Sequence, residues 1–238
     1  MAAVVGLLLV LEAIANPTLA AAFGFDLPSA AHFGSLFDRP AGSVELLRWG
    51  ALLDFGGYLA MGVVVIYVGH RLWRSNELVV GVLTASGVGA TIVGATGAAV
   101  LATVGPALLE GFALAPDTSR EAARVALETV GRVVAAGAWG VVAFGLWGAW
   151  LLGVGWLLRP QGAFAWAALL GGVGMLAASI RTAITGRTLG EGAGPVDALV
   201  VLSIVVLLIF FGVWLLWFML RLWQGSSAPL AESEVSGR

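Results

Sequence analysis

The chain has 238 residues and a formal net charge of −2, and 60% of its residues are hydrophobic while 11% are charged. Soluble domains carry about 25% charged residues, so this composition excludes an ordinary soluble protein and indicates a membrane protein. The small net charge gives no basis for binding nucleic acid. Every cationic residue is arginine and there is no cysteine, which excludes a lysine Schiff base, disulfides, thiolate metal sites and iron–sulfur clusters.

The first apolar run covers residues 1–23 and contains Glu12 and Asn16. We expect a first transmembrane helix here, because the run has no basic segment before it and a carboxylate lies in its middle; a cleaved signal peptide is the alternative. The region 24–43 contains Pro28 and Pro40 together with two aspartates. It is predicted to be a loop outside the lipid.

The next two spans are predicted at 44–73 and 78–109. Small residues recur every four positions in the second of these, at Ser86, Ala90, Gly94 and Ala98. In lipid, small residues at this period allow another helix backbone to approach closely. We therefore expect this helix-packing face to lie in the middle of a bundle.

A long helix is predicted at 118–158, beginning at the capping-box spacing of Thr118 and Glu121. It would be about 60 Å long, twice the thickness of the hydrocarbon core. Its first part carries alternating charges, and no charge occurs from Val133 to Leu158. One helix is therefore expected to pass from a charged surface layer into the membrane.

Two further spans are predicted at 162–185 and 195–223, followed by a disordered polar tail at 224–238. The fold class is thus all-α, a polytopic transmembrane bundle of six helices. The ends of the second, fourth and sixth helices carry arginine with little acidic residue nearby, at Arg71, Arg74, Arg159 and Arg221. By the positive-inside rule, both termini are expected in the cytoplasm of a bacterial cell, with the chain in its inner membrane.

Several ionisable residues then fall toward the outer half of the bundle, and five are candidates for a ligand site: Arg48, Asp54, Glu128, Arg132 and Arg181. Charges at membrane depth are costly, usually paired or hydrated, and often functional. One interpretation is an outward-facing polar cavity that binds a small ligand or a lipid headgroup. The other is a set of ion pairs that lock the helix ends together.

Glu12 differs from these five because it lies midway along the first span, far from either interface. It is expected to be protonated or to face a partner on another helix, as a buried polar site or a proton site. The two histidines, His32 and His70, are predicted at opposite ends of the bundle, so they cannot share a haem or a zinc ion. No cofactor, metal site or catalytic motif is predicted, and an enzyme is not expected.

The chain resembles a bacterial family of six-helix membrane proteins, the domain-of-unknown-function 4386 type. The resemblance rests on Leu46-Leu47-Arg48, the basic turn with Arg71 and Arg74, Arg159-Pro160 and the proline at Pro195. Members usually have an arginine and a glutamate in the third helix, where this chain has Leu83-Thr84-Ala85-Ser86-Gly87. The resemblance implies a topology and no chemistry.

Two functions follow as hypotheses. The first is a non-enzymatic membrane protein that binds a small ligand or headgroup in its outer cavity, or serves as a subunit or partner in a membrane complex. The alternative is a small secondary transporter or channel that uses the same charged cavity. The expected partners are the lipid bilayer and either a second copy or another membrane protein.

Overall fold

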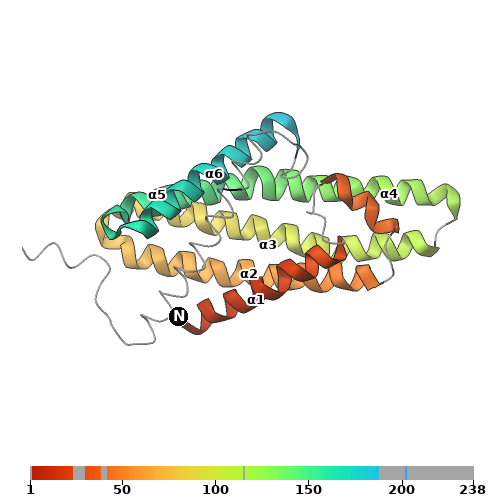
Figure 1. Cartoon of the computed structure of the whole chain (residues 1–238), viewed down its shortest axis with the longest axis horizontal. Helices are drawn as coiled ribbons and strands as arrows, with labels where there is room; N and C mark the ends of the chain where they lie inside the picture. Colours follow the sequence, from red (N-terminus) through yellow and green to blue (C-terminus); the bar gives the residue numbers. More distant parts are fainter. Residues whose placement is uncertain (1, 24–29, 39–41, 115, 188–201, 203–238) are drawn as a thin grey trace, which may run out of the picture.

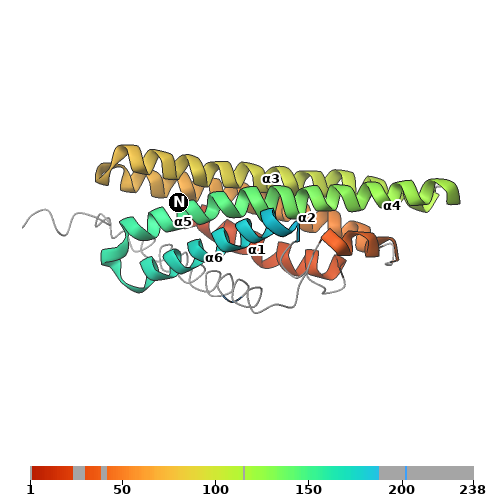
Figure 2. The same ribbon diagram turned by 90° about the horizontal axis from the view of Figure 1, so that it is seen from above.

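The computed structural model describes residues 2–23, 30–38, 42–114, 116–187 and 202, and these form an elongated bundle of helices (Figures 1 and 2). The all-α prediction is confirmed for the described residues. The bundle consists of α1 (Ala2–Ala22), α2 (Gly42–Leu72), α3 (Glu77–Leu114), α4 (Asp117–Arg132), α5 (Phe144–Leu157) and α6 (Ala163–Thr185), with short helical segments between them.

Four of the described helical segments are long and apolar enough to cross a membrane: Gly42–Ser75, Glu77–Leu114, Ser119–Leu157 and Ala165–Thr185. A multi-pass membrane protein is the class that such helices indicate. The predicted sixth span at 195–223 and the tail at 224–238 lie outside the described residues. The same holds for Arg221, one of the four arginines used to predict the orientation.

Helix α1 packs along α2. A Cβ atom on Gly50 would meet the side chain of Leu19, and one on Gly56 would meet Leu11 at 3.3 Å. The absence of side chains on these two glycines therefore brings α1 close to α2 near both of these positions.

The region predicted as a loop contains a 3-10 helix, η1 (Ala30–Asp38). Its apolar residues Phe33 and Leu36 are buried. The spacing of three residues places both side chains on the same side of a 3-10 helix, because that helix has three residues per turn. Burial of this apolar face packs the segment against the bundle. The prolines and aspartates of the region 24–43 do not predict this packing.

Helix α3 lies between α2 and the long helix that contains α4 and α5 (Figure 1), and it runs along one edge of the bundle in the view of Figure 2. It continues to Leu114 with Pro106 inside it, whereas the predicted span ends at 109. Proline removes one backbone donor and usually breaks or kinks a helix. Pro106 is fully buried here. Neighbouring segments therefore pack against the proline, and the helix does not stop at it.

The helix predicted at 118–158 is continuous, but it has three parts. Between α4 and α5 lies a π-helix, η3 (Val133–Ala143), which begins directly after Arg132. The N–H group of Phe144 still donates to the carbonyl of Trp139, five residues earlier, as the wider π turn requires. The start differs from the prediction too: Pro116 is the N-cap residue and provides no side-chain cap, so the predicted Thr118 cap is wrong.

Two buried apolar clusters divide the core along its length. One joins α2, α3 and α5, and includes Val64, Val65 and Trp150. In this cluster the rings of Trp147 and Trp150 meet edge to face, with centroids 5.2 Å apart. The other cluster lies toward the end that carries η1, and it includes Phe33, Leu47 and Leu127. The apolar packing therefore extends into the end of the bundle that carries η1.

Candidate functional site: the charged end of the bundle

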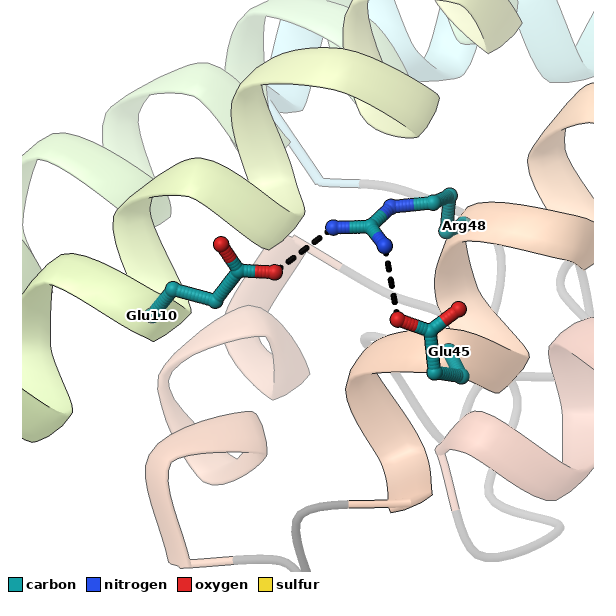
Figure 3. A network of polar contacts seen from close by, with 3 residues as sticks. All are labelled: Glu45, Arg48 and Glu110. Carbon is teal, nitrogen blue, oxygen red and sulfur yellow. Dashed lines mark hydrogen bonds and ion pairs between the residues drawn. The ribbon is translucent and has the colours of Figure 1, made fainter.

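The charged end of the bundle is held by an arginine that bridges two helices (Figure 3). Arg48 of α2 places one guanidinium nitrogen 2.6 Å from Glu45 Oε1 and the other 2.6 Å from Glu110 Oε1. Glu45 lies three residues before Arg48 on the same helix face, and Glu110 is near the end of α3. One guanidinium thus joins the start of α2 to the end of α3.

Geometry and charge both favour this cluster. A planar guanidinium presents several N–H donors, so it can satisfy two carboxylates at once. Glu45 lies in the first turn of α2, where the helix dipole stabilises negative charge. The side chains are nevertheless 34%, 54% and 56% exposed for Arg48, Glu45 and Glu110. In water such pairs are screened, and each would contribute at most about 1 kcal/mol there.

A second set of contacts fastens η1 to α4. Arg124 of α4 lies 3.8 Å from Asp38 Oδ1 and stacks over the ring of Phe37, 5.9 Å from its centroid. The ring of Phe37 also packs against Phe112 of α3, with centroids 4.1 Å apart, and Arg120 lies over Phe112. These contacts join η1, α3 and α4 by stacking of cations and rings.

Apolar contacts lie beneath this layer. The ring of Phe33 meets Phe23 edge to face at 5.2 Å. It also fills the space beside Gly131 of α4, where a Cβ atom would run into the ring. The charged end is therefore a packed helical layer with its own aromatic contacts, in addition to a set of surface charges.

The five predicted ligand residues are distributed over three helices, α2, α4 and α6. Arg48 contacts Glu45 and Glu110, and neither contact involves Asp54. Asp54 is buried on α2, whereas Glu128 and Arg132 are exposed on α4. Arg181 is half-buried at the end of α6 and donates to the carbonyl of Arg187 at 3.0 Å. The described contacts thus link Arg48 to carboxylates outside the predicted set, and the ligand site itself stays a prediction.

Sequence reasoning did not include Glu45 among the site residues, although the Glu45–Arg48 spacing of three is a helix ion-pair signal. Glu110 could not be assigned as the partner of Arg48 because the sequence does not give the register between α2 and α3. Glu12 lies on α1, and the prediction for its side chain is not tested. Within the described residues, no group of three histidine, aspartate or glutamate side chains could hold a metal ion.

The predicted small-residue face of α3 lies against its neighbours. Ser86 Oγ donates to the carbonyl of Leu146 at 2.9 Å, and Ala90 and Ala98 are fully buried. The carbonyl of Gly94 accepts a hydrogen bond from Trp139 Nε1 at 3.1 Å. These contacts join α3 to both η3 and α5.

A second close approach, between α5 and α6, lies outside the predicted packing residues. A Cβ atom on Gly148 would lie 3.0 Å from the carbonyl oxygen of Gly172, and one on Gly172 would lie 2.9 Å from that of Gly148. Nearby, Ser179 Oγ donates to the carbonyl of Val141 at 2.8 Å. The glycine-rich sequence of both helices is the signal that could have indicated this interface.

No protein-family model matches the chain, and neither the curated proteins nor the solved structures include a significant match. The resemblance to the six-helix family of unknown function therefore stays a prediction.

Proposed function

We propose that the protein is a multi-pass, non-enzymatic protein of the bacterial inner membrane that serves as a subunit or structural partner in a membrane complex. Its charged end would be an ion-paired layer outside the hydrocarbon, on the extracytoplasmic side, with both termini in the cytoplasm. The cross-helix bridge of Arg48 to Glu45 and Glu110 is the observation that carries this proposal.

Helix α3 is longer than the hydrocarbon core is thick. Helix α3 has 38 residues and is about 57 Å long at ~1.5 Å per residue, against a hydrocarbon core of ~30 Å. A helix of this length has to leave the lipid on at least one side. Its first residues and the end of α5 lie beside the exposed rings of Trp73 and Trp156, and such rings prefer the membrane interface.

The positions of Arg48 and Glu110 along their helices place these charges relative to the hydrocarbon. If the inner interface lies at Trp73 and Trp156, Arg48 is about 36 Å from the end of α2, and Glu110 is about 50 Å from the start of α3. Both distances exceed the thickness of the hydrocarbon. Protein does not bury these side chains, so beyond the hydrocarbon they would lie in water, where an ion pair does not have to be removed from solvent.

The ion pairs and stacking contacts of the charged end favour a partner role over a ligand site. A guanidinium that already has two carboxylates at 2.6 Å has less capacity left for a ligand. Its contacts tie α2 to α3, while those of Arg124 and Arg120 tie η1, α3 and α4 together. A fixed, ion-paired surface on stiff helices favours docking of another protein over passage of a solute, which usually requires helices that move or break.

The absence of cysteine gives a clean test of the membrane placement. Single variants Leu78→Cys, Ile92→Cys and Gly111→Cys mark the start, the middle and the end of α3, and all three positions are exposed in the structure. A membrane-impermeant maleimide should label Gly111→Cys on intact cells and Leu78→Cys only after permeabilisation. Ile92→Cys should resist labelling because lipid covers it. Labelling of all three from one side would refute the placement.

The partner role needs a separate measurement. The full chain, purified in native lipid particles, should show a second polypeptide or a second copy at a fixed ratio by intact-mass spectrometry. A homogeneous monomer that catalyses solute uptake in vesicles would contradict the proposal and support a transporter.

A further inference from the structure

At the opposite end of the bundle, two arginines lie over aromatic rings. The guanidinium carbon of Arg159 lies 4.3 Å from the ring centroid of Trp156, and that of Arg71 lies 6.0 Å from the centroid of Tyr67. Within the part of the chain that the structure describes, neither arginine has a carboxylate within ion-pair distance. Stacking on a ring leaves the edge of a guanidinium and its N–H donors available.

These two arginines come from neighbouring turns. Arg71 precedes the turn from α2 to α3, and Arg159 opens the turn from α5 to α6, which both lie at the same end of the bundle (Figures 1 and 2). Leu72, Val80 and Leu158, from the residues beside these turns, belong to one buried cluster. The two arginines thus lie at the same end of the bundle, above one buried apolar cluster.

The charge of this face is mainly positive. Arg74 joins the two stacked arginines, while Glu77 is the acidic residue that opens α3. Trp156 is 61% exposed and Trp73 is 45% exposed at the same end. Exposed tryptophan next to arginine, at the end of a membrane helix, is the arrangement that suits the headgroup region of a bilayer.

We propose that Arg71 and Arg159 bind phosphate groups of anionic phospholipids, with Tyr67 and Trp156 positioning the guanidinium groups and contacting the lipid. This inference rests on the proposed membrane placement, with this end in the cytoplasmic leaflet. The forked donors of arginine match phosphate oxygens, and basic sites on the cytoplasmic side of membrane helices select anionic headgroups. Arg48, whose donors already contact two carboxylates, has less of this capacity.

The test uses the full chain in detergent with equal amounts of phosphatidylglycerol and phosphatidylcholine, followed by native mass spectrometry. The parent protein should retain phosphatidylglycerol preferentially. Arg159→Gln and Arg71→Gln should each lower its retention about fivefold and leave phosphatidylcholine unchanged. Trp156→Leu should weaken retention although the charge remains. Inorganic phosphate alone should not displace the lipid.

The matched control is Arg120→Gln, which removes the same charge from a guanidinium over the Phe112 ring at the other end of the bundle. It should leave the lipid preference intact, and the unfolding temperature of every variant should be compared with the parent. Equal retention of both lipids by the parent would overturn the proposal, as would an equal loss in the control or displacement by phosphate. Cysteine labelling that places this end outside the membrane interface would instead refute the proposed function.

Discussion

Replacement of Arg48 by methionine measures whether the bridge between α2 and α3 lies in water. Methionine keeps the length of an unbranched apolar chain and removes the charge, so Glu45 and Glu110 lose a shared partner at 2.6 Å. Exposed ion pairs contribute about 0.2–1 kcal/mol each. We therefore expect a loss of about 1 kcal/mol, or roughly 2–4 °C in the unfolding temperature for a chain of this size.

The assay is thermal unfolding of the purified protein in one mild detergent, at low and at high salt. Salt at about 1 M shortens the Debye length to ~3 Å, so the difference between Arg48→Met and the parent should largely disappear. Glu110→Gln alone and in combination completes a double-mutant cycle, in which the coupling should stay below about 1 kcal/mol.

A loss of about 3–5 kcal/mol that does not respond to salt would refute this reasoning. Such a value is typical of a buried pair that loses one partner in a low-dielectric environment. It would mean that lipid or protein surrounds the bridge. Arg120→Met is the control, because it removes an arginine from the same end without breaking the bridge.

Three further predictions concern packing and helix ends. Gly148→Ala should lower the unfolding temperature by an amount equivalent to about 1–3 kcal/mol, because its Cβ would lie 3.0 Å from a backbone oxygen of α6, whereas Gly137→Ala, with nothing within 4 Å, should be neutral or stabilising. Ser179→Ala should cost roughly 0.6–2 kcal/mol by removing the 2.8 Å hydrogen bond to Val141. Gly186→Ala should cost about 1 kcal/mol, because Gly186 ends α6 with a φ of 66°. Thermal unfolding of the variants checks all three, and an effect of Gly137→Ala as large as that of Gly148→Ala would contradict the close-approach argument.

The sequence predicted the described helices well because hydrophobic runs of this length have one stable solution in lipid. Helices α2 and α6 begin and end within two residues of the predicted spans at 44–73 and 162–185. The continuation of α3 past Pro106 could not be predicted, since it accompanies packing from other parts of the chain. The same is true of η1, whose Phe33 and Leu36 are buried only because the bundle surrounds them.

The site was harder to predict than the helices because ion pairs across helices depend on register. The Glu45–Arg48 contact follows from spacing along one helix, but the Arg48–Glu110 contact joins residues 62 positions apart in the chain. A single sequence without an alignment carries no information on such a pair. The alternating charges of α4 indicated a surface layer, yet they did not show that Arg124 contacts Asp38 of η1.

The π-helix Val133–Ala143 marks the change from the charged to the uncharged part of the long helix. Irregular backbone at membrane depth is tolerated only where protein covers it, since hydrocarbon offers no hydrogen bonds. Protein covers one side of the segment: Val134, Ala136 and Gly140 are buried, and Ser179 of α6 donates to the carbonyl of Val141, whereas Val133 and Val142 are exposed. The wider turn also carries Trp139, whose indole donates to Gly94 of α3. The π-helix is thus one of the places where α3 and α6 contact the long helix, directly after its charged part, and both contacts there are hydrogen bonds between a side chain and a backbone carbonyl.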